Sequence, residues 1–94
     1  MITRIVKMHF KSSEIENFQL LYQSVKLKIN SYDGCEGVTL VQDTMNPEIF
    51  FTLSHWQSTQ HLDHYRTSAL FEDTWAKTKV MFAAKPMAWS TQEA

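Results

Sequence analysis

The sequence has a single cysteine, Cys35, and no cluster of cysteine and histidine with the spacing of a structural zinc site. An internal disulfide is therefore impossible. A domain of 94 residues buries only about 60–65% of the surface that its unfolded chain exposes, which leaves its own core marginal. Because disulfides and structural metals are excluded, self-association is the reinforcement that remains.

The chain also lacks a charge excess of either sign and any long apolar run. Nine basic and ten acidic side chains give a net charge of −1, so no basic stripe is present to neutralise the phosphates of a nucleic acid. No apolar run approaches the ~20 residues that a membrane-spanning helix needs. The first residues, MITRIVKMHFK, carry charges every few positions and are unlike a signal peptide. These features predict a cytoplasmic protein with neither nucleic acid nor membrane as a partner.

What the sequence does contain is a regular succession of apolar patterns, with a period of two for strands and three- and four-residue steps for helices. The predicted strands are residues 3–10, 36–43, 49–56 and 85–91, and the predicted helices are residues 14–30, 59–66 and 69–84. The order β-α-β-β-α-β, with the second helix broken in two, is typical of the ferredoxin-like α+β fold, whose helices cover one face of an antiparallel sheet. We expect one domain, residues 1–94, with a disordered tail at about 91–94.

Polar residues at the predicted helix starts match capping patterns. Ser13, with Glu16 three residues later, has the spacing of a capping box at the first helix. Ser58 and Ser68 stand at the N-cap positions of the second and third helices. A turn at Asn46 and the proline after it predicts a hairpin between the second and third strands. The apolar stripe of the first helix is formed by Ile15, Phe18, Tyr22, Val25 and Ile29, with Leu20 and Leu27 on the opposite side.

Both faces of the third predicted strand are apolar. Ile49, Phe51 and Leu53 alternate with Phe50 and Trp56. A single layer of helices covers only one face of a sheet, so the other face would leave a large exposed apolar patch. Patches of this kind usually mark an interface. We therefore expect a homodimer in which two sheets pack face to face.

Motifs along the chain suggest a family. The segment DGCEGVTLVQDTMNPEIFFTLSHWQS contains a Gly-centred turn, two paired strands and a Trp-x-Ser helix entry, and Ser68 and Phe71 match a Ser-x-x-Phe helix start. With these motifs the chain resembles, over nearly its whole length, the antibiotic-biosynthesis-monooxygenase family of dimeric α+β barrels. The resemblance implies a homodimer. It also implies a function, since the family includes cofactor-free oxygenases of quinols or polycyclic aromatic phenols, and haem-degrading enzymes.

Haem degradation fits the sequence less well. The haem-degrading members need an Asn on the first strand, near the place where this chain has Lys7 or Met8. They also need a Trp where Tyr65 stands and a haem-ligating His where Trp75 stands. These departures argue against haem degradation. Other members often have a His at the position of Tyr65, nine residues after Trp56.

Cofactor-free oxygenation requires an electron-rich phenolate or enolate before O₂ can take an electron. A base or hydrogen-bond acceptor must therefore sit in an apolar pocket. The candidate bases are His9, His55 and His61, because histidine titrates near pH ~6.5. Tyr65, on the sheet-facing arc of its helix, is the candidate hydrogen-bonding partner of the substrate oxygen. The candidate substrate-binding residues are the aromatic side chains of Phe51, Phe71, Trp75 and Phe82.

Each of these residues also has a structural explanation. Aromatic residues at helical spacing are typical of a small core, and a strand histidine can be hydrogen-bonded at a dimer interface. His61 and His64, three residues apart, have no third metal ligand nearby. Two functions therefore stay open. The first is a cofactor-independent monooxygenase that oxidises a small aromatic or quinol-type substrate with O₂ in a pocket between helices and sheet. The second is a non-catalytic small-ligand-binding or stress-related dimeric module on the same fold. Neither calls for a metal or a cofactor.

Overall fold

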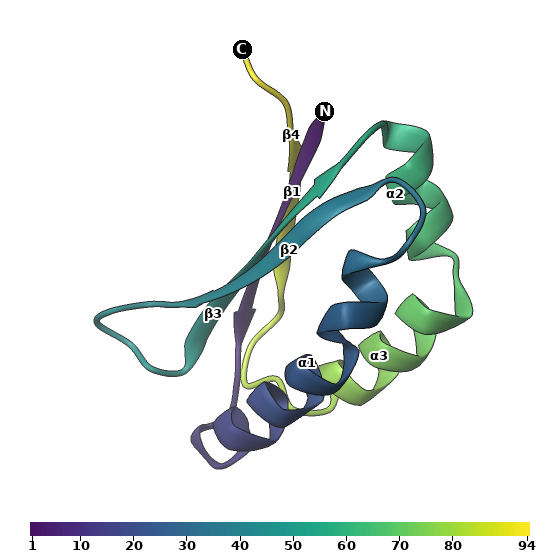
Figure 1. The fold of residues 1–94 in the computed structure, drawn as a ribbon. Helices are drawn as coiled ribbons and strands as arrows, with labels where there is room; N and C mark the ends of the chain where they lie inside the picture. The colour runs from purple at the N-terminus through teal and green to yellow at the C-terminus, as the bar shows by residue number, and fades with distance from the viewer.

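A four-stranded antiparallel sheet carries helices on one of its faces in the computed structural model, which describes residues 1–94 (Figure 1). The elements are β1 (Ile2–His9), the 3-10 turn η1 (Ser12–Glu14), α1 (Ile15–Asn30), β2 (Cys35–Gln42), β3 (Ile49–Trp56), α2 (Thr59–Arg66), α3 (Ala69–Lys79) and β4 (Met87–Thr91). The strand order β2-β3-β1-β4 is that of the ferredoxin-like fold. The predicted α+β architecture is confirmed. Every helix falls short of the length and hydropathy that crossing a bilayer requires.

The first strand of the chain lies in the middle of the sheet, because β1 pairs with β3 on one side and with β4 on the other. β2 and β3 form the predicted hairpin. Its turn is held by the carboxylate of Asp43, which accepts hydrogen bonds from the backbone N–H groups of Met45 at 3.0 Å and Asn46 at 2.7 Å. The Asn46 side chain in turn accepts from the backbone N–H of Glu48. These are the local bonds by which Asp and Asn favour turns.

The core lies between the helices and the side of the sheet that faces them. Phe10, Phe50 and Trp56 are its largest fully buried side chains. They alternate along β1 and β3 with side chains of the opposite face, as the period of two predicts. The helices contribute Phe18, Tyr22 and Ile29 from α1 and Leu62 and Tyr65 from α2. Leu20 and Leu27, on the other side of α1, are exposed.

Two helix starts follow the prediction and one does not. The hydroxyl oxygen of Ser58 accepts from the backbone N–H of His61, and that of Ser68 from Phe71. The predicted capping box at Ser13 is wrong. The backbone N–H of Glu14 donates to the carbonyl of Lys11 at 2.9 Å, so residues 12–14 form a 3-10 turn, and α1 begins at Ile15 without a side-chain cap.

α3 ends at Lys79, five residues before the predicted end. The following residues bond to the end of β1 instead: the backbone N–H of Lys11 donates to the carbonyl of Met81 at 3.0 Å, and that of Ala83 donates to the carbonyl of His9 at 2.8 Å. These bonds replace the helical ones and carry the chain across to β4. β4 begins at Met87, two residues later than predicted, and includes Thr91, the first residue of the predicted tail.

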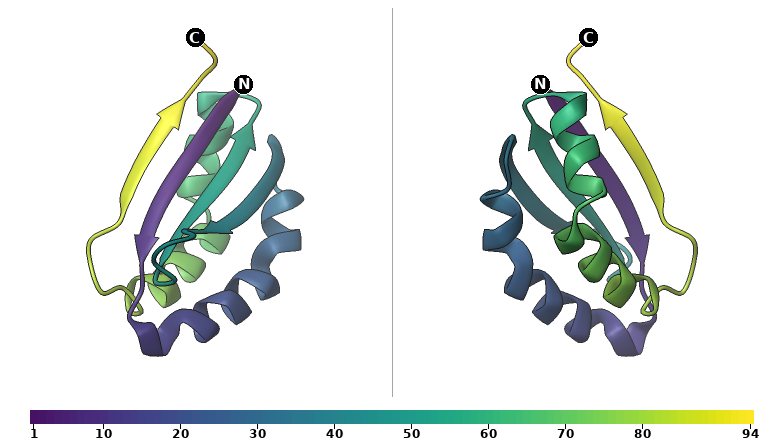
Figure 2. Two further views of the ribbon diagram at one scale, coloured as in Figure 1. Left: turned by 90° about the vertical axis from the view of Figure 1, so that its left-hand side faces the viewer. Right: turned by 90° about the vertical axis from the view of Figure 1, so that its right-hand side faces the viewer.

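No helix covers the opposite face of the sheet, which we call the bare face. In the left view of Figure 2 the strands lie in front of the helices, and in the right view the helices lie in front of the sheet. In register across the bare face, Ile5 lies between Leu53 and Trp89. Phe51 lies beside Val41 on β2. The side chains of Trp89 and Val41 are 42% and 40% exposed, so both faces of the sheet are apolar, as the sequence indicates.

Gly34 lies close against the side chain of His61 at the start of α2. It lies between α1 and β2 with a φ of 82°, and its carbonyl accepts from the backbone N–H of Gln57 at 2.9 Å. A Cβ atom at this position would overlap the imidazole ring of His61. Only glycine combines the positive φ with this contact.

We expect the substitution Gly34→Ala to lower the free energy of unfolding by roughly 1–3 kcal/mol, because it adds backbone strain and displaces the His61 ring. Urea denaturation followed by circular dichroism measures the loss. Gly37→Ala is the matched control, since Gly37 has a φ of 138° but an added Cβ there meets no atom within 4 Å. Equal losses in the two variants would contradict the role given to the His61 contact.

Candidate functional site

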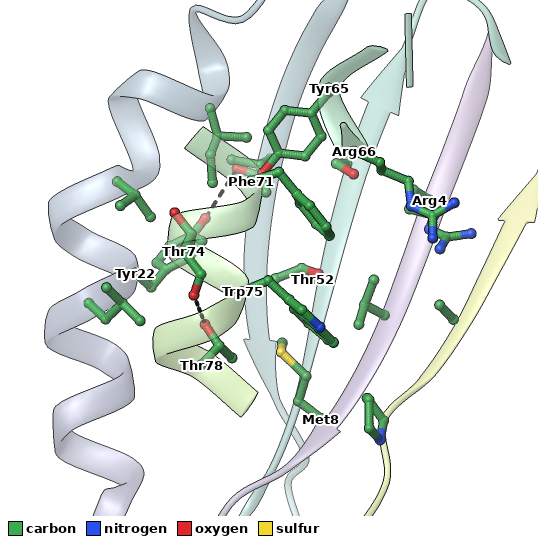
Figure 3. Close-up of a pocket in the computed structure, with 18 of the residues that line it drawn as sticks. Arg4, Met8, Tyr22, Thr52, Tyr65, Arg66, Phe71, Thr74, Trp75 and Thr78 are labelled. Atoms are coloured by element: carbon green, nitrogen blue, oxygen red, sulfur yellow. Dashed lines mark hydrogen bonds between the residues drawn. The ribbon is translucent and has the colours of Figure 1, made fainter. Parts of the chain in front are cut away.

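A cavity of about 270 Å³ lies between the helices and the sheet (Figure 3). An apolar cavity of ~150 Å³ is large enough to bind benzene, and typical ligand pockets begin at ~300 Å³. The cavity therefore suits a compact ligand of one or two rings. Thirteen of its 20 lining residues are hydrophobic, which favours an apolar ligand body.

The cavity exists because the inward side of β3 changes in size along its length. Phe50 and Trp56 are large and lie near its two ends, whereas Thr52 and Ser54 between them are small. Phe50 belongs to an aromatic cluster at one end of the sheet, and Trp56 to a cluster at the other. The Phe10 cluster consists of Phe10, Phe18, Phe50 and Phe82, and the Trp56 cluster of Tyr32, Trp56 and Tyr65. The clusters hold the helices away from the sheet, and the space over Thr52 and Ser54 stays open.

One wall of the cavity is aromatic. Phe71 and Trp75 lie one turn apart on α3 and are nearly parallel, with ring centroids 5.9 Å apart and an interplanar angle of 10°. Tyr65 on α2 meets the ring of Phe71 edge to face at 5.3 Å. This arrangement follows from the helical spacing, because side chains three and four residues apart share one face. The wall offers flat surfaces against which a ring can stack.

The hydroxyl of Tyr65 is a hydrogen-bond donor at neutral pH. Burial raises the pKa of Tyr65 to about 12, with smaller contributions from Cys35 and Tyr32. The residue lines the cavity. Tyr65 therefore keeps its proton and can donate a hydrogen bond to a ligand oxygen.

A hydroxyl without a protein partner belongs to Thr74 on α3. Its oxygen is buried and makes no hydrogen bond. One turn later, the hydroxyl of Thr78 donates to the backbone carbonyl of Thr74 at 2.7 Å, as Figure 3 shows. A buried hydroxyl without a partner is costly. The two threonines line the same cavity. The hydroxyl of Thr74 is free to hydrogen-bond a ligand, whereas that of Thr78 already donates to a carbonyl.

Both arginines of the chain, Arg4 and Arg66, line the cavity. A terminal nitrogen of Arg4 donates to the hydroxyl oxygen of Ser90 at 3.0 Å. Burial, followed by the positive charge of Arg66, lowers the pKa of Arg4, and the carboxylate of Asp63 acts in the opposite direction with the smallest effect. Sequence reasoning did not select these residues. The sequence signal that could have identified Arg4 is its position on the same strand face as the apolar Val6 and Met8.

The predicted histidines lie outside the cavity. His9 is bonded to the carboxylate of Glu48 at 2.8 Å, and His55 to the hydroxyl of Thr3 at 3.0 Å. Both side chains belong to the bare face, because they are in register with Ile49 and Thr3 rather than with core residues. His61 bonds the hydroxyl of Ser58 at 2.7 Å at the start of α2.

The predicted aromatic residues divide in the same way. Tyr65, Phe71 and Trp75 are brought together at the cavity. Phe51 lies on the bare face beside Val41. Phe82 packs against Phe10 and Trp75 behind the cavity wall, with ring centroids 5.3 Å and 5.6 Å away. The structure therefore brings three of the predicted residues together at one cavity and places the others elsewhere.

Ser58, His61 and Asp33 are the residue types of a hydrolase triad, but their geometry is that of a helix cap. The Ser58 oxygen accepts the backbone N–H of His61. The His61 ring is 3.9 Å from the carboxylate of Asp33, whose side chain is 83% exposed. This distance exceeds that of a hydrogen bond. Elsewhere, no three or more His, Cys, Asp or Glu side chains are grouped as they would be to hold a metal ion.

Comparisons with known proteins agree with this architecture. The family model of the antibiotic biosynthesis monooxygenases matches residues 1–77. No curated protein sequence matches the chain significantly. A crystal structure of an antibiotic biosynthesis monooxygenase has a TM-score of 0.93 and 17% sequence identity, covering 100% of this chain and 99% of the other.

Two further solved structures are similar over almost their whole length. A conserved protein from Methanosarcina mazei Go1 has a TM-score of 0.93 at 21% identity, covering 100% of this chain and 94% of the other. A protein from Mycobacterium tuberculosis has a TM-score of 0.90 at 13% identity, covering 99% and 94%. At these identities the likeness shows the fold.

We expect Thr74→Val to raise the free energy of unfolding by about 1 kcal/mol, because it replaces a buried hydroxyl without a partner by a methyl group of similar size. Thr78→Val is the matched control, and it should lower stability by about 0.5–1.5 kcal/mol because a hydrogen bond is lost. Chemical denaturation of the three proteins gives both values. Destabilisation by Thr74→Val to the same extent as by Thr78→Val would show that the Thr74 hydroxyl has a partner in the protein.

Proposed function

The chain belongs to the antibiotic biosynthesis monooxygenase family, and we propose from this membership and from the cavity that it is a cofactor-independent monooxygenase of a small aromatic or quinol-type substrate. The observation that carries the proposal is the combination of a ring-sized apolar cavity with an aromatic wall, the protonated hydroxyl of Tyr65 and the unpaired hydroxyl of Thr74. Binding sites of this composition orient an apolar body by a few polar contacts.

The proposed reaction begins with ionisation of a substrate phenol. The phenolate transfers one electron to O₂, and the resulting pair joins at a ring carbon that carries hydrogen, forming a carbon–oxygen bond. Loss of this hydrogen as a proton, with cleavage of the O–O bond and uptake of protons by the leaving oxygen, gives a quinone and one water molecule. One oxygen atom of O₂ enters the product and the other leaves as water, so the substrate itself supplies all the electrons.

The residues of the cavity match two needs of this reaction. Phe71 and Trp75 provide the flat wall against which the substrate ring stacks. The protonated hydroxyl of Tyr65 donates a hydrogen bond to the substrate oxygen, and such a donor stabilises negative charge in a water-poor site. The lining contains no histidine and no carboxylate. In this proposal the phenol proton therefore passes to water, and His9, His55 and His61 take no part in its removal.

We also propose that two copies pack through their bare faces to form a homodimer. The bare face carries apolar side chains from all four strands, and its edge residues Met87 and Trp89 are 52% and 42% exposed. Two sheets that pack face to face bury such residues between them. A domain with so small a core also gains stability from this burial.

We expect the wild-type protein to consume O₂ aerobically with at least one member of a panel of one- and two-ring quinols, measured with an oxygen electrode. Tyr65→Phe should lower kcat by about ten- to a hundredfold, the effect of losing a hydrogen bond to a charged oxygen. Tyr32→Phe is the matched control, because it removes a hydroxyl that does not line the cavity. His9→Ala should leave the rate unchanged.

Two results would count against this proposal. Equal rates for Tyr65→Phe and the wild type would remove Tyr65 from the reaction. Binding of aromatic rings without O₂ consumption from any quinol would favour the non-catalytic small-ligand-binding module, because the same cavity would then act by binding alone.

We expect the wild type to sediment at micromolar concentration as twice the 11.0 kDa chain. Trp89→Asp should shift it to the single chain, because a carboxylate would be buried between the sheets without a partner. Leu27→Asp is the matched control, since Leu27 is 77% exposed on the outer side of α1, and it should leave the dimer intact. A wild-type protein that sediments as one chain would refute the dimer.

A further inference from the structure

The two arginines of the chain lie at the same site. Arg4 and Arg66 are the only arginines in the sequence, and they come from different elements, β1 and the last turn of α2. Both nevertheless line the same cavity, and Figure 3 shows their side chains extending toward the same side of it. Neither guanidinium forms a salt bridge, since the ion pairs of the molecule involve other residues.

Arg4 is half-buried and has few polar partners within the protein. Arg4 lies on the helix-facing side of a central strand, in register with Ser54 and Ser90. A guanidinium group has five N–H donors, and the hydroxyl of Ser90 is the protein acceptor that it reaches. A half-buried guanidinium with one protein acceptor keeps donors free for an anionic ligand. The nearby positive charge of Arg66 repels that of Arg4, which the carboxylate of Asp63 offsets only in part.

The other polar groups of the cavity suit an anion as well. The lining has no Asp, Glu or His. Tyr65 keeps its proton, because burial raises its pKa to about 12. Of the remaining hydroxyls, that of Tyr22 donates to the carbonyl of Val38 and that of Thr78 to the carbonyl of Thr74. The charged groups of the lining are thus cationic donors only, and a cationic ligand would find no charge partner there.

We propose that the ligand is an aromatic anion of one or two rings, whose carboxylate or phenolate oxygen lies between the guanidinium groups of Arg4 and Arg66. Its ring lies against Phe71 and Trp75. The planar fork of a guanidinium matches the geometry of such oxygens and forms strong charge-assisted bonds with them. This inference rests on the proposed function for the aromatic character of the ligand, and it names the ionic form in which the cavity binds it.

A mechanistic consequence follows for phenols. Two positive charges favour the ionised form of a bound phenol and lower its pKa. The phenol proton leaves to water and the phenolate stays between the arginines. The cavity can in this way hold the electron-rich anion that O₂ requires, although no side chain in its lining acts as a base.

The test compares two ligands of nearly the same shape, 2-naphthoate and its neutral amide 2-naphthamide, by isothermal titration calorimetry at pH 7. We expect the wild type to bind the carboxylate about tenfold or more tightly than the amide, the contribution of a charge-assisted hydrogen bond. The preference should decrease at high ionic strength, because Arg66 is exposed to solvent. Equal affinities for the two ligands, or binding of neither, would overturn the proposal.

Variants then assign the preference to the arginines. Arg4→Gln and Arg66→Gln should each weaken the binding of 2-naphthoate about tenfold and leave that of 2-naphthamide unchanged. Lys28→Gln makes the same change in net charge on the exposed side of α1, outside the cavity lining, and should have no effect. If Arg4→Gln unfolds the protein, the exposed Arg66 still supplies the test. Equal loss of both ligands in Arg66→Gln would overturn the proposal.

A third probe distinguishes a phenolate from a carboxylate. The absorbance of 4-nitrophenol reports its ionisation, and its pKa should fall on binding to the wild type and fall less on binding to Arg66→Gln. An unchanged pKa with preserved 2-naphthoate selectivity restricts the site to carboxylates. Anion selectivity without O₂ consumption from any quinol would refute the monooxygenase and leave the anion site in place, so the two proposals fail on different measurements.

Discussion

Two aromatic clusters at opposite ends of the sheet determine how the helical layer is supported. In the Phe10 cluster, the rings of Phe10 and Phe18 stack at 4.1 Å and join the residue that follows β1 to α1. In the Trp56 cluster, the rings of Trp56 and Tyr65 stack at 4.7 Å and join β3 to α2. Aromatic side chains supply most of the buried area in a small core. Because the bulk is concentrated at the ends, the small residues Thr52 and Ser54 leave the middle open, and the cavity is a result of the same packing that stabilises the fold.

Alternation along the strands assigns neighbouring residues to different surfaces. On β1, Arg4 and Val6 line the cavity, whereas Ile5 and Lys7 lie on the bare face. A shift of one residue in register would exchange the two sets. The large residues Phe10, Phe50 and Trp56 prevent this shift, since they fit only between sheet and helices. The proposed dimer contact and the proposed ligand site are therefore separated by the thickness of one sheet and can be altered independently.

The sequence was sufficient for the fold because periodicity is a local property. The strands, the order of elements and the caps at Ser58 and Ser68 all follow from short patterns. The 3-10 turn before α1 did not, because the backbone N–H of Glu14 bonds to Lys11 instead of to a capping side chain. The end of α3 did not either, because it depends on backbone bonds such as that from Ala83 to His9, between segments far apart in the chain. The aromatic part of the candidate site was predictable from helical spacing. His9 and His55 interrupt apolar strand patterns, but a strand that is apolar on both sides does not reveal which side the helices cover.

The position of Arg4 on an apolar strand face is a feature of the sequence that points to a binding role. Arg4 shares its strand face with the buried Met8 and is itself half-buried, so an anionic partner is favoured at this position. A search for a base favours histidine and passes over arginine, which does not lose its proton in proteins. A cavity can, however, favour ionisation of its ligand by supplying positive charge instead of accepting a proton. The lining has hydrogen-bond donors and no base, so in the proposed reaction the ligand forms the anion by losing its own proton to water. The protein contributes the two arginines, whose positive charges stabilise that anion.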